Sequence, residues 1–321
     1  MSLFEKTHIG QLEVKNHFIR SATYEGKATI DGRPTEAIIE LYEKLAKGNI
    51  GTIITSYSYI TEYEQPAKNQ LGIYCDDLIE DYRKLVDRVH DCGSKIVMQI
   101  VHGSSSRQAF PDQAKILGPS AITHETTGII PKEMSKEDIL SVVDLFAKAA
   151  KRVQEAGFDG VQIHCAHGYL LSQFISPLYN HRSDEYGGCV ENRVRIVQEV
   201  YHAIRKEVGK DYPIWIKINC SDEVPHGLTV QDFLKMAQIL VKDGIDVIEV
   251  SGNAWKNHKP EESAYYKDAA IELSELVNIP IILTGGLKSL DDILPIYNNT
   301  KVQFFGFARP LMKDPNFINK L

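Results

Sequence analysis

The segment HCAHGY at residues 164–169 places two histidines and a tyrosine within six positions, directly after a run of apolar residues. His164 and His167 could bind a metal ion such as zinc, but no HExxH motif or Cys/His partner supplies a third ligand. They could also be packed histidines whose ring nitrogens are satisfied inside the fold. The favoured interpretation is a pair of donors that converge on one acceptor atom, with no metal. Tyr169 would then be a nearby proton source, because a phenol with a pKa of about 10 is a poor base but a usable acid at neutral pH.

Two further polar residues interrupt segments that are otherwise apolar. Lys217 lies within PIWIKIN, and if its side chain points into the fold, the buried ammonium needs an anionic partner. If it points outward, its alkyl stem can extend between helices while the charge stays in water. Gln99 lies within KIVMQI, and its amide offers both donors and an acceptor, which suits the edge of an imide.

Two turns of small residues could bind an anion. TGG at residues 284–286 precedes a helix that starts near Ser289, so backbone N–H groups and a helix N-terminus would lie together. GFARP at residues 306–310 adds a second such turn and one permanent cation, Arg309. Ordinary turn formation is the alternative explanation, but the two turns together favour a phosphorylated ligand or cofactor.

The elements that would position these residues alternate between short apolar runs and longer amphipathic runs. The runs typical of strands are residues 16–22, 51–56, 95–100, 160–165, 213–219, 246–252, 279–286 and 302–308. The runs typical of helices are residues 35–49, 76–93, 135–157, 191–209, 229–244, 271–278 and 290–300. This alternation predicts an α/β fold, a (β/α)8 TIM barrel formed by a single domain over residues 1–321. A doubly wound open sheet is the alternative, although no GxGxxG follows the first strand.

Two segments lie outside this alternation. Residues 7–16 predict a small N-terminal β-hairpin. Residues 101–134 form a long interruption after the third strand, and we expect them to lie over the mouth of the barrel as a cap. Sites in such barrels form where the strands end, and a phosphate commonly binds after the seventh and eighth strands, where the two turns occur.

The composition disfavours several classes of protein. The net charge of −7 argues against a nucleic-acid partner and against electrostatic binding to a membrane, both of which need a basic surface. No apolar run reaches the roughly 18 residues of a membrane helix, and the N-terminus lacks a signal-peptide pattern. The five scattered cysteines indicate reduced thiols. We therefore expect a cytoplasmic protein, and the sequence leaves open whether it forms a homo-oligomer.

The segment HCAHGYLLSQFISPLYNHRSDEYGGCVENR at residues 164–193 closely resembles the signature segment of the old yellow enzyme family, the FMN-dependent ene reductases and NAD(P)H:flavin oxidoreductases. Shorter matches follow the family's order over nearly the whole chain, including NHFIRSATYEG, KIVMQIVHG, IPIILTGGLKS and FFGFARPLMKDP. The resemblance implies a TIM barrel closed at its base by the hairpin, with FMN at the top and NADH or NADPH as reductant. The chain ends at Leu321 without the cysteine cluster of relatives fused to an iron–sulfur segment, so electrons are expected to enter directly from nicotinamide.

The resemblance also implies a role for each matching residue. Bordering the flavin ring would be Ser21, Ala22, Thr23, Tyr57 and His164, with Gln99 at the pyrimidine edge and Lys217 near N1–C2=O, where many relatives have arginine. Holding the phosphate would be Gly285, Gly286, Gly306, Ala308 and Arg309. His164 and His167 would bind the carbonyl oxygen of the substrate, and Tyr169 would deliver a proton.

The implied reaction is hydride transfer from reduced FMN to the β-carbon of an α,β-unsaturated carbonyl, or to a related quinone or nitro acceptor. Tyr24 departs from the family pattern because some relatives have Cys or Thr beside flavin N5, and Tyr57 departs because that residue is often small. Two alternatives remain open. One is a Schiff-base lyase or aldolase that uses Lys217 as its nucleophile. The other is a non-catalytic flavin protein for redox sensing or electron delivery, with the histidine pair unused.

Overall fold

Eight parallel strands close into a barrel in the computed structural model, which describes residues 2–112, 114–252, 258–259 and 261–321. The strands are β3 (Phe18–Arg20), β4 (Thr52–Ile54), β6 (Lys95–Val101), β9 (Gly160–Cys165), β10 (Ile214–Asn219), β11 (Val247–Ser251), β12 (Ile281–Thr284) and β13 (Phe304–Phe307). β3 pairs with β13 and β4, and β4 also pairs with β6, so the ring is complete. The TIM barrel and all eight predicted strands are confirmed, and the open-sheet alternative is wrong.

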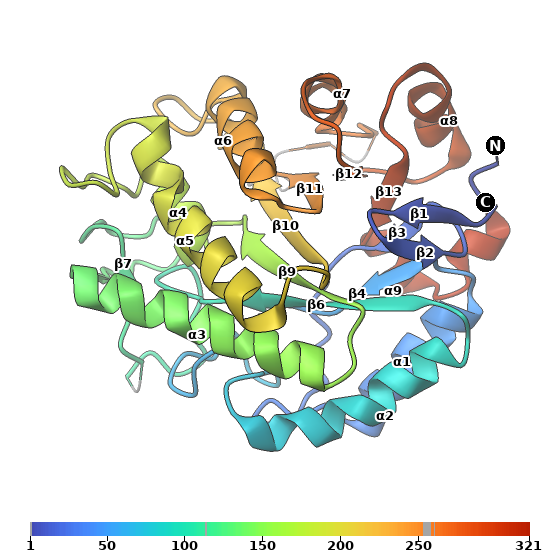
Figure 1. The fold of residues 1–321 in the computed structure, drawn as a ribbon, viewed down its shortest axis with the longest axis horizontal. Coiled ribbons are helices and arrows are strands. Elements are labelled where there is room, and N and C mark those ends of the chain that lie inside the picture. The colour runs from blue at the N-terminus through green and yellow to red at the C-terminus, as the bar shows by residue number, and fades with distance from the viewer. Residues whose placement is uncertain (1, 113, 253–257, 260) are drawn as a thin grey trace.

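Helices cover the outside of the barrel (Figure 1). They are α1 (Glu36–Lys47), α2 (Ile79–His90), α3 (Lys136–Glu155), α5 (Val190–Val208), α6 (Val230–Asp243), α7 (Lys267–Leu276) and α8 (Leu290–Asn299). α3 begins at a capping box, in which Ser135 Oγ accepts from the Asp138 N–H and the Asp138 carboxylate accepts from the Ser135 N–H, both at 3.1 Å. α7 begins at Lys267 rather than at the predicted Ile271. No helix among the described residues combines the length and apolarity needed to cross a bilayer.

Several short elements have no counterpart in the sequence patterns. They are α4 (Leu170–Ile175), β5 (Ser58–Tyr59), β7 (Leu117–Gly118), β8 (Lys132–Glu133), α9 (Arg309–Lys313) and the 3₁₀ turn Phe317–Lys320; a further 3₁₀ turn, Asp76–Leu78, forms the start of the helix predicted over residues 76–93 and leads into α2. Every residue of α4 is buried, so its sequence LLSQFI lacks the exposed polar face that gives a helix its period. The other elements are too short to show any period.

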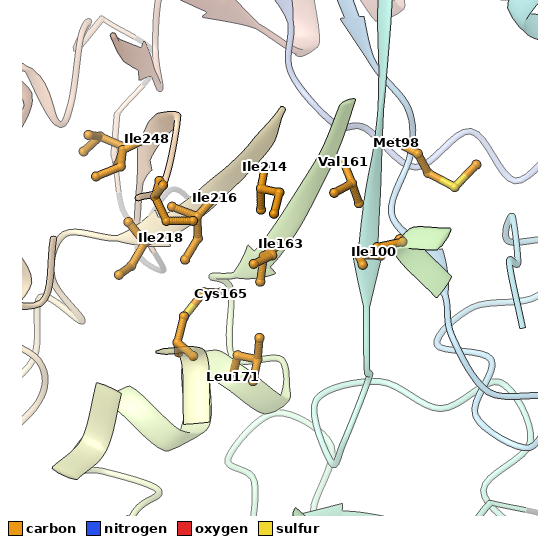
Figure 2. Packing of buried hydrophobic residues seen from close by; sticks show 14 of the residues in the cluster. Met98, Ile100, Val161, Ile163, Cys165, Leu171, Ile214, Ile216, Ile218 and Ile248 are labelled. Atoms are coloured by element: carbon orange, nitrogen blue, oxygen red, sulfur yellow. The ribbon is translucent and has the colours of Figure 1, made fainter. Parts of the chain in front are cut away.

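Alternation along each barrel strand separates side chains that face the helices from side chains that face the interior. In β10, Ile214, Ile216 and Ile218 belong to the large core between strands and helices, which Figure 2 shows together with residues of β6, β9 and β11. Trp215 belongs to a separate interior core, and Lys217 lies above it in the same inward row. The inward row of the strands therefore carries the polar residues of the candidate site.

The N-terminal hairpin, β1 (Thr7–Ile9) and β2 (Leu12–Val14), closes one end of the barrel. Ile9 and Val14 are buried against inward residues of the barrel strands, among them Trp215. In Figure 1 the hairpin and both chain termini lie at one end, whereas α4 and β7 lie at the other. The predicted position of the hairpin is confirmed, and the base of the barrel is an apolar layer.

The segment 101–134 leaves the barrel at the end of β6 and returns to it before α3. Its two short strands, β7 and β8, pair in parallel, with Leu117 opposite Lys132. Five of its residues line the cavity described below, and these are Ser106, Arg107, His124, Glu125 and Thr126. The predicted excursion over the mouth of the barrel is therefore present.

Gly306 in β13 has a packing reason to be glycine. It lies opposite Thr284 of β12, and an added Cβ would be 2.0 Å from Thr284 Oγ1, which donates to the Glu249 carboxylate at 2.8 Å. We expect Gly306→Ala to lower the free energy of unfolding by about 1–3 kcal/mol, measured by urea denaturation. Gly306→Ala should lower the free energy of unfolding by less in a Thr284→Ala background, because the oxygen that the added Cβ would clash with is absent there. An equal cost in both backgrounds would contradict this explanation.

Candidate active site

A cavity of about 470 Å³ opens at the carboxyl ends of the barrel strands. Its volume lies within the range of small-molecule sites, roughly 300–1,000 Å³. Seven of the predicted site residues line it: Ala22, Tyr57, Gln99, His164, His167, Tyr169 and Lys217. Tyr24 also lines it, as do the five residues of the cap. Sequence reasoning did not single out these cap residues, because nothing in an irregular segment indicates which side chains point inward.

The turn after β9 brings the two histidines and Tyr169 to the same cavity. His167 and Gly168 have φ angles of 62° and 77°, which reverse the chain between the end of β9 and the start of α4. The His167 N–H donates to Asn219 Oδ1 at 3.2 Å and thereby holds this turn. The His164 ring centroid is 5.2 Å from that of His167 and 5.0 Å from that of Tyr169. A left-handed histidine is uncommon, and such residues cluster at functional sites.

The histidine rings differ in their hydrogen bonds. Nδ1 of His164 is buried without a partner among the described residues, whereas His167 Nε2 lies 2.9 Å from Ser251 Oγ. Burial, followed by the charge of Lys217, lowers the pKa of His167 to about 3. Burial, followed by His167 and Lys217, lowers the pKa of His164 well below its usual value. Both rings are therefore neutral at pH 7, and each carries one N–H to donate.

These low pKa values have a consequence for stability. A histidine whose pKa is lower in the folded than in the unfolded protein binds fewer protons when folded, so stability falls as the pH falls below about 6.5. For His167, the pH range over which stability falls extends from about 6.5 down to the pKa in the folded protein, about 3. We expect the free energy of unfolding to decrease between pH 7 and pH 5, with each such histidine contributing up to about 1.4 kcal/mol per pH unit.

His167→Asn isolates this contribution, because Asn tolerates a left-handed φ and does not titrate. The urea unfolding free energy of the variant should vary less steeply between pH 7 and pH 5 than that of the wild type. Identical slopes in the two proteins would show that His167 is not held neutral.

Two phenols lie beside the histidines. The Tyr57 ring centroid is 5.2 Å from that of Tyr169 and 6.2 Å from that of His164, and the Tyr57 side chain is 7% exposed. Burial raises the pKa of both phenols, and Tyr57 adds to the shift of Tyr169. The Tyr24 ring stacks on Tyr57 at 6.4 Å, while its hydroxyl donates to the Lys68 carbonyl at 2.6 Å. Tyr24 and Tyr57 thus form one aromatic wall of the cavity.

Lys217 points into the barrel and has the anionic partner that its burial requires. Its Nζ lies 3.0 Å from Glu249 Oε1 and 2.8 Å from Ser21 Oγ, and the two charged side chains are 3% and 0% exposed. The outward alternative is wrong. Sequence reasoning missed Glu249, although the same signal marks it, a charged residue inside an apolar strand, DVIEVSG.

Three of the five residues predicted to bind a phosphate, Gly285, Gly286 and Arg309, lie beside Tyr265, and none of the five lines the cavity. Gly285 and Gly286 have φ angles of 128° and 74°, and a Cβ on Gly286 would be 2.6 Å from the Tyr265 ring. The Tyr265 N–H donates to the Gly285 carbonyl at 3.1 Å, and Arg309 Nη2 donates to the Tyr265 hydroxyl at 3.1 Å. Tyr265 is therefore the immediate neighbour of any group bound at this turn. Ser21, Thr23, Gly306 and Ala308 also do not line the cavity.

The described residues contain no group of three or more His, Cys, Asp or Glu side chains that could hold a metal ion. The buried His164 Nδ1, which has no partner among the described residues, favours a bound ligand here, since a buried polar atom without a partner is costly.

The family model for the NADH:flavin oxidoreductase / NADH oxidase family matches residues 2–321. The chain belongs to this family. An NADPH dehydrogenase of Clostridium acetobutylicum is 32% identical over 323 residues, which cover 99% of this chain and 94% of that protein. A metal reductase of Desulforamulus reducens is 35% identical over 324 residues, 99% of this chain and 48% of that protein. The chain thus spans about half the length of the first curated relatives it matches.

A solved structure of this NADH:flavin oxidoreductase family agrees with the fold. The old yellow enzyme of Pichia sp. AKU4542 matches with a TM-score of 0.82 and 26% identity over 99% of this chain and 86% of that one. The resemblance to the old yellow enzyme family is therefore confirmed.

The donor set of the cavity fits the flavin that this family implies. Gln99 offers an amide, Lys217 a cation, and Tyr24 and Tyr57 aromatic faces. His164 also lines the cavity, and its buried Nδ1 has no partner among the described residues. The chemistry of these groups suits an aromatic ring system with an imide edge and an oxygen-bearing ligand beside it.

Proposed function

We propose that the protein is an FMN-dependent oxidoreductase that takes electrons from NADH or NADPH and reduces a small electrophilic alkene. The observation that carries this proposal is the convergence of His164, His167 and Tyr169 on one cavity that Lys217 and Gln99 also line. The family supports the cofactor and the reductant. Bound FMN would supply hydride transfer, first as acceptor from the nicotinamide and then as donor to the β-carbon of the substrate.

The chain's own residues would place the flavin. Lys217 and Gln99 would contact its polar edge, and Ser21, Ala22 and Thr23, which follow β3, would border the ring. Gly285, Gly286, Gly306, Ala308 and Arg309 would hold the phosphate. Tyr265 lies against that glycine turn, so its side chain would contact the phosphate or move to admit it.

The histidine pair would bind the carbonyl oxygen of the substrate. His164 and His167 are neutral N–H donors fixed before the substrate arrives, and such donors stabilise the negative charge that develops on the oxygen. Tyr169 would protonate the α-carbon. Its pKa is raised, which makes it a weak acid, but an enolate-like carbon is basic enough to take the proton.

Substrates of this site would be α,β-unsaturated carbonyl compounds, quinones or nitro compounds, all of which present an oxygen to the histidine pair. A Schiff-base reaction is less well supported, because a lysine nucleophile must be a free amine, whereas Lys217 donates to Glu249 and Ser21. A non-catalytic flavin protein would share the cofactor site and differ only in lacking turnover.

The test begins with the purified protein and added FMN. We expect a yellow complex with the two flavin absorption bands, bleached by NADH or NADPH without oxygen and restored by an enone. A phenol should add a long-wavelength charge-transfer band by binding at the histidine pair. Protein that stays colourless with added FMN would contradict the cofactor, and a bleached complex that no acceptor restores would favour the non-catalytic alternative.

A further inference from the structure

Glu249 is the centre of a hydrogen-bonded group inside the barrel and is not among the described residues that line the cavity. Its Oε1 accepts from Ser21 Oγ at 2.6 Å, Thr284 Oγ1 at 2.8 Å and Lys217 Nζ at 3.0 Å. Its Oε2 accepts from Gln162 Nε2 at 2.8 Å. Burial opposes ionisation, but the charge of Lys217 and these hydrogen bonds outweigh it and hold the pKa of the carboxyl below its usual value. The side chain is therefore a carboxylate, a pure acceptor.

Because the Glu249 carboxylate can only accept hydrogen bonds, it determines which way round the side-chain amides of Gln162 and Gln99 are oriented. Gln162 must turn its NH2 group toward Glu249, so its carbonyl oxygen faces Gln99 and accepts from Gln99 Nε2 at 2.7 Å. Gln99 is 1% exposed and lines the cavity. Its carbonyl oxygen and second amide hydrogen are then the groups left for a ligand. This arrangement suits an imide, which offers an N–H donor beside carbonyl acceptors.

The other oxygen of the Glu249 carboxylate, Oε1, holds the Lys217 ammonium in position. Lys217 has three N–H groups, and it donates to Ser21 and to Glu249 within the part of the chain that is described. This leaves one N–H for the cavity that Lys217 lines. The opposite charge of Glu249, at 3.0 Å, reduces the field that the ammonium exerts on anything bound there.

We propose that Glu249 is a positioning residue for the flavin, an inference that rests on the proposed function. It determines which atoms Gln99 and Lys217 present to the flavin, and its charge offsets that of Lys217. A lone cation beside a flavin favours the reduced form, which carries more negative charge, and so raises the reduction potential. The Lys217–Glu249 pair keeps the potential lower and makes the bound flavin a stronger reductant.

The test is the midpoint potential of FMN bound to Glu249→Gln, measured against a reference dye. We expect the variant to favour reduced over oxidised FMN at least tenfold more than the wild type, a rise of about 30 mV for a two-electron couple. Thr284→Val is the matched control, because it removes one hydrogen bond from the same carboxylate without changing a charge. The preference of Thr284→Val for reduced over oxidised FMN should stay within threefold of that of the wild type. An unchanged potential in Glu249→Gln would overturn the proposal, and so would an equal rise in Thr284→Val.

A second variant covers the case in which Glu249→Gln does not fold, since it leaves Lys217 as a buried unpaired charge. Lys217→Met/Glu249→Gln has no buried charge and the same net charge as the original pair. Its preference for reduced FMN should therefore stay within tenfold of the wild type. A decrease of more than tenfold would mean that Lys217 acts on the flavin uncompensated, and would overturn the proposal. Wild-type protein that binds no FMN would instead contradict the proposed function, so the two failures are distinguishable.

Discussion

Replacing Tyr169 with phenylalanine should slow the reduction of an enone by about 10²–10⁴-fold and leave the reduction of the flavin by NAD(P)H unchanged. The change removes one hydroxyl and keeps the ring that packs 5.0 Å from His164 and 5.2 Å from Tyr57. Only the second half-reaction needs a proton delivered to carbon. Rapid-mixing measurements of each half-reaction under anaerobic conditions separate the two effects. An equal loss in both would show that the variant has disturbed the cofactor and not a proton donor.

The neighbouring phenol gives the control for this assignment. Tyr57→Phe removes a hydroxyl that lies in the same cavity and keeps the ring that packs 5.2 Å from that of Tyr169. If Tyr169 is the donor, this variant should alter substrate affinity more than the rate of proton transfer. Burial and Tyr57 hold the pKa of Tyr169 well above its usual value, so its proton is retained beyond pH 10. The enone half-reaction of the wild type should therefore not decline between pH 7 and pH 9 through loss of this proton. A large loss in Tyr57→Phe alone would transfer the role to Tyr57.

The barrel could be predicted because its signals are local. Each strand is a short apolar run, and each long helix shows an amphipathic period with recognisable caps, such as Ser135 before α3. Once eight such units are recognised, the closed parallel barrel fixes the neighbours of each strand. The short elements could not be predicted because α4 is buried on all sides and β5, β7 and β8 are two residues long.

The candidate site was predictable where a polar residue interrupts an apolar strand. Lys217 and Gln99 were identified in this way, and Glu249 carries the same signal. In the barrel the fifth and sixth strands are neighbours, and the structure pairs Lys217 directly with Glu249. The register between the two strands was the missing information, since a shift of one residue would turn Glu249 to the outside.

Other parts of the site depend on contacts that no local pattern encodes. Tyr265 comes after β11 in the chain, yet it lies against Gly286 and donates to the Gly285 carbonyl at the end of β12. Arg107 and His124 reach the cavity from an irregular segment that leaves the barrel and returns to it. Such placements follow from tertiary packing over long sequence separations, so sequence spacing indicates that a cap exists but not which of its side chains face the ligand.

Replacing His164 with alanine should lower the rate of enone reduction by about 10²–10³-fold, the usual cost of losing one preorganised donor to a developing oxyanion. The ring is 2% exposed, lies at the end of β9 and has a buried Nδ1 without a partner among the described residues. A ligand oxygen would satisfy that nitrogen. The same variant should weaken phenol binding, followed by the charge-transfer band, because the phenol oxygen would occupy the same position.

His164→Asn is the matched variant, since its amide nitrogen stands at the same number of bonds from Cβ as Nδ1 of histidine. It should recover most of the rate and of the phenol affinity that His164→Ala loses, because it restores an N–H donor without restoring an imidazole. The neutral state of His164 predicts this recovery: a donor that acts as a neutral N–H can be replaced by an amide, whereas an imidazolium acting through its charge cannot. If asparagine recovers nothing while alanine abolishes turnover, His164 acts through a proton and not as a fixed donor.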